Sequence, residues 1–420
     1  MRTRSAAILL ILATAIPRLA VLLQQRGAIL SSFTDKGDDF ARTFIASGTY
    51  GFIPHYPSAS TQPLYGWFLV PLYWIFGRHW EVVGLAHLAI ACMTTLVVWR
   101  IGTRWLSPVA GVIAGLLVAV HPYLVWHDMH MNREILDHLL AASTVFLTLW
   151  AAERFGWKRA LPLGAVIGLA ILGNVRLEAL PIVLAVVLLV RCGVGRRTLL
   201  AGGVIVAATA LVLVPWVVRN KVQLGCWAVT TDARALWKAN NVKTYETLKH
   251  GGWIDHVPQP ASFPPTPQDV FEHWQRTGVV LPYDECAQMT MFEHKVVSFW
   301  VHHPGDKLRL VPLDAQWLWQ PSVVETRGRP GAGTWLDTAR SWAEPLYMIP
   351  LYLLGAMGLF LVPRFFAWLV VVFLGYQTAV AVLFVGETRY RAPWDFLIAL
   401  LAAAALVRLG QRARARASAG

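Results

Sequence analysis

Long apolar segments alternate with short polar ones over most of this 420-residue chain. A helix needs about 20 apolar residues to cross the roughly 30 Å of hydrocarbon in a bilayer. Ten segments approach that pattern, although two neighbouring ones are short. The ten are 6–24, 80–99, 107–121, 135–152, 160–174, 177–191, 199–218, 343–361, 366–385 and 393–408. The pattern predicts an all-α polytopic membrane protein with about ten transmembrane helices.

One long polar region interrupts this pattern, from Arg219 to about Trp342. It is rich in Pro, Gly, Trp and charged residues and has no apolar run of spanning length. Apolar residues recur at helical spacing over 285–303. We therefore expect a small, partly helical domain on the membrane surface. It would separate an N-terminal transmembrane region from C-terminal transmembrane helices and a basic tail. The three parts are 1–218, 219–342 and 343–420.

The composition agrees with a membrane protein. Hydrophobic residues make up 56% of the chain and charged residues only 15%, and the mean hydropathy is +0.49. A soluble globular protein carries about a quarter charged residues, so much of this surface must face lipid. The net charge of +13 does not indicate nucleic-acid binding, because the basic residues occur as pairs and triplets between apolar runs. We expect membrane lipids and no nucleic acid among the partners.

The distribution of these charges predicts the orientation of the chain. If the N-terminus is cytoplasmic, the inner loops collect most of the short-loop Arg and Lys residues and a single acid, Glu153. This asymmetry is the one that the positive-inside rule describes. It places both termini in the cytoplasm of a multi-pass cell-membrane protein. The long polar region and the alternate short loops, here called the outer loops, then lie on the extracytoplasmic side.

The first outer loop carries three carboxylates within five residues, Asp35, Asp38 and Asp39. A carboxylate close to hydrocarbon loses hydration and is hard to keep charged, so such a cluster is a candidate functional site. The alternative is a solvated loop without chemistry. Adjacent residues of a helix or strand point in different directions. We therefore expect one of Asp38 and Asp39 to face a cavity.

Carboxylates and arginines are mixed in the other outer loops. This combination suits a reaction that takes up a proton and binds an anion such as a phosphate. Simpler roles are open as well: a carboxylate in the first turn of a helix favours the helix dipole, and an interfacial arginine can reach lipid head groups. The candidates are Asp128, Arg133, Glu134, Arg176, Glu387, Arg389 and Arg391.

Histidines and cysteines support weaker hypotheses. His127 and His130 have the spacing of a helical turn, beside His121, but no further ligand pattern accompanies them, so we predict no metal site there. Cys226 and Cys286 share the long polar region, where they could form a disulfide or both stay free. The sequence contains neither a G-x-x-x-x-G-K-[ST] loop nor a G-x-S-x-G elbow, which argues against ATP-driven transport and serine hydrolysis.

Four stretches of the chain resemble the GT-C superfamily of integral membrane glycosyltransferases. They are ARTFIASGTYGF in the first outer loop, NREILD in the second, VPWVVRNKVQLGCWAVTTDARALWKANN after the seventh span, and GETRYRAPWDFLIALLAA near the end. The likeness is in particular to the group that uses polyprenyl-phosphate sugars, which includes protein mannosyltransferases and lipid A aminoarabinose transferases. The first loop departs from the common Asp-Glu pair, because Asp38 and Asp39 stand there instead.

This resemblance implies transfer of a sugar from a polyprenyl phosphate on the outer face, with inversion, to a glycan, lipid or protein acceptor. Asp38 or Asp39 would be the general base, and Glu134 would orient donor or acceptor. The substrate-binding residues would be Arg133, Asp128, Arg176, Glu387, Arg389 and Arg391, with the arginines holding the departing phosphate. No cofactor follows with certainty, because some GT-C enzymes use a divalent metal ion and others do not.

Two other classes of protein compete with this hypothesis. A transporter or lipid flippase would carry polar residues at mid-membrane, often on broken helices in repeated halves. The centres of the predicted spans are nearly free of charge, and no internal repeat is detected. A non-catalytic scaffold that binds a partner through its outer domain would not account for the carboxylates in the outer loops. The sequence therefore favours the transferase.

Overall fold

The computed structural model describes residues 3–32, 34–322 and 335–418, with side chains up to 322 and from 341. The described residues form helices joined by loops, and none of them belongs to a β-strand. The all-α prediction is therefore confirmed. The segment 323–334, which falls in the predicted outer domain, lies outside the described residues.

Six helical segments in the described residues are long and apolar enough to span a membrane. This confirms a multi-pass membrane protein but not the predicted count of about ten spans. The helix α5 (Pro108–Ala119) has 12 residues and α9 (Leu180–Cys192) has 13, so each is only about 20 Å long at 1.5 Å per residue. The six are α1 with η1 (Thr3–Leu30), α4 (Trp80–Trp105), α7 (Glu134–Glu153), α10 (Arg196–Leu224), α17 (Arg364–Leu383) and α18 to α19 (Thr388–Ala417).

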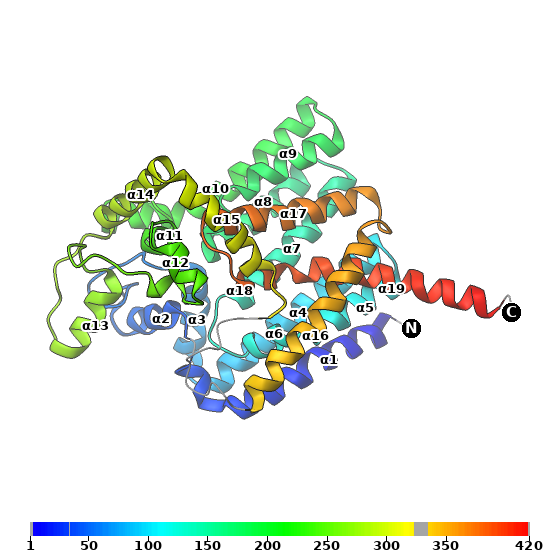
Figure 1. Cartoon of the computed structure of the whole chain (residues 1–420), viewed down its shortest axis with the longest axis horizontal. Coiled ribbons are helices and arrows are strands. Elements are labelled where there is room, and N and C mark those ends of the chain that lie inside the picture. The colour runs from blue at the N-terminus through cyan, green and yellow to red at the C-terminus, as the bar shows by residue number, and fades with distance from the viewer. Residues whose placement is uncertain (1–2, 33, 323–334, 419–420) are drawn as a thin grey trace.

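The last helix, α19 (Asp395–Ala417), forms the centre of the bundle over its first half (Figure 1). Phe396 and Leu400 are fully buried there, and α19 packs against α5 and α16 (Trp335–Leu359). A Cβ atom at Gly358 of α16 would lie 2.0 Å from the Leu401 carbonyl oxygen. A glycine is therefore required for these helices to approach so closely, as is common between helices in membranes. The second half of α19 projects from the bundle.

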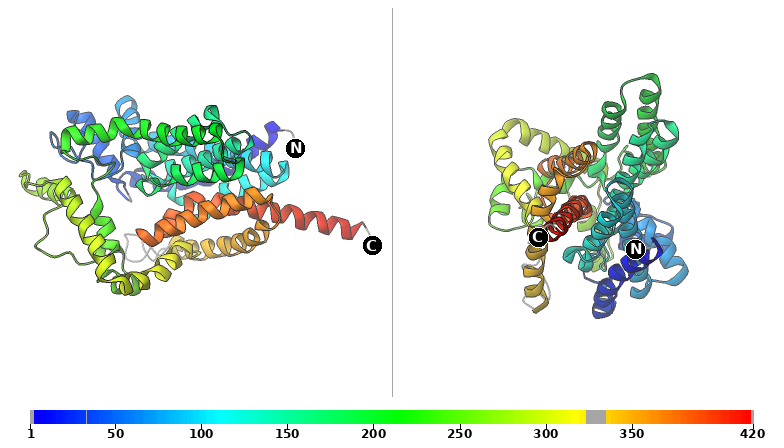
Figure 2. Two further views of the ribbon diagram at one scale, coloured as in Figure 1. Left: turned by 90° about the horizontal axis from the view of Figure 1, so that it is seen from above. Right: turned by 90° about the vertical axis from the view of Figure 1, so that its right-hand side faces the viewer.

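The polar helices gather at one end of the bundle, and both termini lie at the other end (Figures 1 and 2). The predicted helical spacing over 285–303 is confirmed by α14 (Glu285–His302). The other helices of this end are α2 (Lys36–Ser47), α3 (Pro63–Phe76), α6 (Pro122–His127), α11 (Ala233–Ala239), α12 (Thr244–Lys249), η3 (Ile254–His256), α13 (Pro267–Thr277) and α15 (Pro304–Trp319). We call this end the polar end.

A disulfide joins two parts of the polar end. Cys226 follows the last residues of α10, and Cys286 lies in the first turn of α14; their Cα atoms are 5.8 Å apart and their sulfur atoms are bonded. Of the two alternatives that the sequence left open, the structure shows the disulfide. The bond holds the start of α14 against the end of a membrane-spanning helix. It is typical of proteins in oxidising compartments.

Candidate active site

A cavity of about 390 Å³ opens at the polar end, where the outer loops converge. Its walls come from the start of α2, the start of α7, the turn η2 (Val175–Leu177), helix α11 and helix α18 (Thr388–Arg391). Four acidic and six cationic side chains line it. They are Asp35, Glu134, Asp232 and Asp255, with Lys36, Arg133, Arg176, Arg234, Lys238 and Arg389. The cavity therefore has the mixed charge that suits proton transfer beside anion binding.

Asp35 places a carboxylate in this cavity at the start of α2. It is the N-cap residue of that helix, and its Oδ1 atom accepts a hydrogen bond of 2.8 Å from the Gly37 amide. Its own amide donates to the Met131 carbonyl at 2.8 Å, which ties α2 to the loop before α7. Burial raises the pKa of the Asp35 carboxyl above its usual value, and the Arg133 charge and the Gly37 amide offset part of this effect. A carboxylate with a raised pKa is a stronger base.

Asp38 and Asp39 lie in the first turn of α2 but not among the residues that line the cavity. The buried Asp38 carboxylate faces α3 and accepts hydrogen bonds from the Tyr73 hydroxyl at 2.7 Å and from Arg78 at 2.7 and 2.9 Å. Asp39 forms an ion pair with the half-exposed Arg42. The structure therefore places Asp35, and neither of the two expected aspartates, at the cavity.

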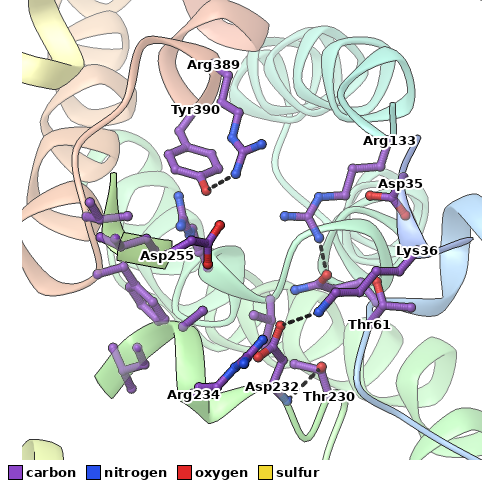
Figure 3. Close-up of a pocket in the computed structure, with 18 of the residues that line it drawn as sticks. Asp35, Lys36, Thr61, Arg133, Thr230, Asp232, Arg234, Asp255, Arg389 and Tyr390 are labelled. Carbon is purple, nitrogen blue, oxygen red and sulfur yellow. Dashed lines mark hydrogen bonds and ion pairs between the residues drawn. The ribbon is translucent and has the colours of Figure 1, made fainter. Parts of the chain in front are cut away.

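Glu134 and three of the predicted arginines, Arg133, Arg176 and Arg389, line the same cavity. Arg133 donates a hydrogen bond to Gln62 beside Asp35. Figure 3 shows Arg133 and Asp35 across the cavity from Arg389. Glu134 lies 4.0 Å from the Arg389 guanidinium, which also pairs with Glu387 at 2.7 Å. These contacts hold guanidinium groups on both sides of the cavity.

Arg176 adds a third guanidinium group from the turn η2. Its guanidinium carbon lies 3.4 Å from the centre of the Tyr390 ring, a cation–π contact. The Tyr390 hydroxyl in turn accepts a hydrogen bond of 2.7 Å from Arg389. The aromatic ring therefore connects two of the cations that face the cavity.

Three predicted site residues lie elsewhere. Asp128 forms a buried ion pair with Arg18 of α1 at 2.8 Å. Arg391 pairs with Asp395 at 2.9 Å and donates to two carbonyl groups at the end of α15, so its charge is satisfied inside the protein. Glu387 is buried behind Arg389 and does not line the cavity. In this structure these three side chains stabilise the fold around the site.

The charged residues of α11 were not among the site residues predicted from the sequence. Arg234 and Lys238 are four residues apart, so they share one face of the helix, and both line the cavity. Just before α11, Asp232 pairs with Lys36 at 3.2 Å. Burial opposes its ionisation, but the Lys36 and Arg234 charges hold the pKa of Asp232 below its usual value. The stretch TTDARALWKANN carried the family resemblance and was the available signal for these residues.

The three histidines of the second outer loop do not form a common metal site. His121 pairs with Asp395 at 3.2 Å, whereas the Nδ1 atom of His130 lies 2.9 Å from the Trp126 carbonyl oxygen. His127 stacks on Tyr123 and lines the cavity. Within the described parts of the chain, no group of three His, Cys, Asp or Glu side chains is arranged to hold a metal ion.

The loop that carries Glu387 and Arg389 depends on Gly386. A Cβ atom at this position would lie 1.7 Å from the Asp314 carbonyl oxygen. We expect Gly386→Ala to lower the free energy of unfolding by about 1–3 kcal/mol, because the backbone of α15 would have to move. Thermal unfolding in nanodiscs measures this, with Gly375→Ala as the control, since a Cβ atom there meets nothing within 4 Å. Equal unfolding midpoints for the two variants would contradict the prediction.

Comparisons with known proteins agree with this architecture. A structure of the oligosaccharyltransferase of Archaeoglobus fulgidus, tethered to an acceptor peptide, matches with a TM-score of 0.53 and 16% identity over 97% of this chain and 50% of that chain. A second structure of the protein, with an inhibitory peptide and a dolichol-phosphate, matches with a TM-score of 0.50 and 14% identity over 99% and 52%. The chain thus spans about half the length of these proteins. ArnT from Cupriavidus metallidurans, bound to undecaprenyl phosphate, gives a TM-score of 0.43 and 16% identity over 96% and 78%.

The predicted resemblance is confirmed: this is a membrane protein with the GT-C fold. Residues 58–218 match the sequence profile of a family described as dolichyl-phosphate-mannose-protein mannosyltransferase. That segment runs from the first outer loop to α10 and includes Arg133, Glu134 and Arg176. A comparison with curated proteins gave no match.

Proposed function

We propose that this protein transfers a sugar from a polyprenyl-phosphate donor to an extracytoplasmic acceptor. The observation that carries the proposal is the cavity, in which the half-buried Asp35 carboxylate lies across from Arg389 at the polar end of a GT-C bundle (Figure 3). The family profile and the fold support this class of reaction. A related fold has been observed with dolichol-phosphate, which supports a lipid-linked donor. The acceptor would be a glycan, a lipid or a protein.

In this reaction Asp35 acts as the general base. It takes the proton from an acceptor hydroxyl while the hydroxyl oxygen attacks the anomeric carbon of the sugar. The bond between that carbon and the phosphate oxygen breaks, and its electron pair leaves with the phosphate. Attack from the face opposite the phosphate inverts the configuration. A base within hydrogen-bond reach of the attacking group contributes about 10²–10⁴-fold to such a step.

The arginines stabilise the phosphate that departs. Because the lipid phosphate leaves as an anion, fixed cations can replace protonation by an acid. Arg389 and Arg176 face the cavity from two separate elements and hold the phosphate, whereas Arg133 lies beside Asp35 and compensates its charge. Glu134, between the arginines, orients the donor or the acceptor. This assigns base and phosphate site to opposite walls of the cavity.

We propose that the polar end is extracytoplasmic and that both termini are cytoplasmic. The exposed end of α19 carries Arg412, Arg414 and Arg416, and cationic segments remain on the cytoplasmic side. With this orientation the helices from α11 to α15 cover the cavity on the outer face. The lipid chain of the donor then lies in the bilayer, while its sugar reaches the cavity.

A direct test is transfer by the purified protein in nanodiscs, with a panel of polyprenyl-phosphate sugars and acceptor hydroxyls. Ligand-induced thermal shifts first identify the donor that binds. Arg389→Ala is expected to weaken this shift, and Lys249→Ala, on the exposed surface of α12, serves as its control. Stabilisation without transfer, together with movement of the lipid across the bilayer, would instead identify a flippase.

The proposed base makes the reaction dependent on pH. Asp35 must be ionised to accept a proton, and its pKa is raised by burial. Activity should therefore fall as the pH decreases through a pKa above the ordinary aspartate value of about 3.9. Since the Arg133 charge lowers this pKa, Arg133→Gln should move the acidic limb of the kcat profile to a higher pH. A limb at the same pH in both proteins would contradict the assignment of Asp35.

A further inference from the structure

Glu285 lies outside the cavity and connects two segments that form its walls. Its side chain is buried, and its Oε2 atom accepts hydrogen bonds from the Ala59 amide at 2.9 Å and from the Thr231 hydroxyl at 2.7 Å. Ala59 belongs to the first outer loop, and Thr231 to the segment before α11, so the two donors are far apart in the sequence. One carboxylate oxygen therefore joins three parts of the polar end.

The two segments also bind one another directly. The Ala59 carbonyl accepts hydrogen bonds of 2.9 Å from the Thr231 amide and from the Thr230 hydroxyl. Burial raises the pKa of Glu285, while the two donors favour its charged form. The resulting cluster of Ala59, Thr230, Thr231 and Glu285 is here called the clasp.

Each segment of the clasp carries residues that line the cavity. On the first loop, Thr61 and Gln62 follow Ala59, and Gln62 accepts a hydrogen bond from Arg133. On the second segment, Asp232 follows Thr231 and pairs with Lys36 at 3.2 Å. Arg133 is the main countercharge of Asp35, and Lys36 is its neighbour in the chain. A shift of either segment therefore changes the surroundings of the proposed base.

The disulfide holds Glu285 in place. Cys286 is the next residue of the chain and is bonded to Cys226, two residues after the end of α10. The first turn of α14 is also capped, because Asp284 accepts a hydrogen bond of 2.9 Å from the Ala287 amide. The start of α14 is thus fixed covalently to a membrane-spanning helix, and Glu285 extends from it into the clasp.

We propose that Glu285 is a positioning residue for the base side of the cavity, and that the Cys226–Cys286 disulfide maintains this role. The link to turnover rests on the proposed function, whereas the ordering of the two segments does not. Arg176 and Arg389 belong to η2 and α18, which the clasp does not contact through these bonds. Loss of the clasp should therefore slow the chemical step and leave lipid-phosphate binding unchanged.

Three variants test this proposal. Glu285→Ala removes the acceptor oxygen, whereas Glu285→Gln retains an amide oxygen that can accept both hydrogen bonds. The double variant Cys226→Ala with Cys286→Ala removes the covalent restraint. Glu293→Ala is the matched control, because Glu293 is an exposed residue of the same helix. Misplacement of reacting groups by about 1 Å can cost roughly 100-fold in rate, so we expect Glu285→Ala to lower kcat by about 10–100-fold.

The first measurement is hydrogen–deuterium exchange in nanodiscs without substrate. In Glu285→Ala and in the double cysteine variant, protection should fall together in peptides covering 57–62 and 229–232. In Glu285→Gln and Glu293→Ala it should stay as in the wild type. The second measurement compares kcat with the dissociation constant for undecaprenyl phosphate, the probe for the phosphate site.

Lost protection, a lower kcat and unchanged binding of undecaprenyl phosphate would support the proposal. Unchanged exchange in Glu285→Ala, or lost protection with wild-type kcat, would overturn it. Weaker binding of the lipid phosphate in step with the loss of kcat would indicate a general structural role and would also overturn it. If the wild type transfers no sugar, the proposed function fails, and the exchange result alone decides whether the clasp exists.

Discussion

Asp35→Asn is expected to lower kcat for sugar transfer by about 10²–10⁴-fold, the usual contribution of a general base. The amide cannot accept the proton of the acceptor hydroxyl. Its oxygen can still accept the hydrogen bond that the Gly37 amide donates to Asp35, so the cap of α2 is retained. We therefore expect the unfolding midpoint and the affinity for the lipid donor to change little. Single-turnover transfer in nanodiscs measures the chemical step directly.

Asp39→Asn is the matched control for this prediction. Asp39 lies one helical turn further along α2 and is paired with Arg42 outside the cavity. Its variant should transfer sugar at close to the wild-type rate. If Asp39→Asn were inactive and Asp35→Asn active, the base would not be Asp35, and the cavity in this structure would not be the site of the reaction.

The sequence predicted the positions of the helices well and their roles in the membrane less well. Each of the ten apolar segments falls on a helix. High hydropathy indicates that a segment lies in an apolar environment. The protein interior and the lipid are both apolar, so hydropathy does not distinguish a buried helix from one that spans the membrane. The short helix α5, for example, is apolar because it packs between α1, α4 and α19. Its 12 residues are fewer than the 20 or so that a helix needs to cross the bilayer, and the hydropathy of the segment alone does not reveal this.

The residues of the candidate site that could be predicted are those whose charge and position in one short segment are enough to bring them together. Arg133 and Glu134 lie together at the start of α7, so one loop brings both to the cavity. The choice among the aspartates depended instead on the residue at which α2 begins. Because α2 begins at Lys36, Asp35 becomes its cap and Asp38 turns towards Tyr73 and Arg78. The sequence pattern does not fix a helix start to a single residue.

Contacts between residues far apart in the sequence account for the other differences between the predicted site residues and those that line the cavity. Arg391 and Arg389 are two residues apart and look equivalent in the sequence. Arg391 contacts Asp395 and the carbonyl groups at the end of α15, whereas Arg389 faces the cavity. The contact between Lys36 and Asp232 joins residues 196 positions apart. Neither arrangement follows from local spacing, since both depend on how α11, α15 and α18 pack at the polar end.

Asp128→Ala is expected to lower the free energy of unfolding by about 3–5 kcal/mol, the cost of leaving a buried charge without its partner. The Arg18 guanidinium is 1% exposed and is bound to Asp128 by two contacts of 2.8 and 2.9 Å. Its remaining hydrogen bonds go to the Ala119 and Thr14 carbonyl groups. Among the described residues, no carboxylate other than that of Asp128 lies within 4 Å of this guanidinium. Denaturant unfolding in nanodiscs measures the loss.

The double variant Arg18→Met with Asp128→Leu separates a structural role from substrate binding. Replacing both members of a buried ion pair by apolar residues is often neutral or stabilising, so this variant should recover most of the stability that Asp128→Ala loses. Its affinity for the lipid donor should match that of the wild type, because neither residue lines the cavity. A stable double variant that no longer binds the donor would show that Asp128 contributes to the substrate site, as the sequence first suggested. Recovery of both properties would mean that the pair connects α1 to the loop before α7 and thereby supports the wall that holds Arg133 and Glu134.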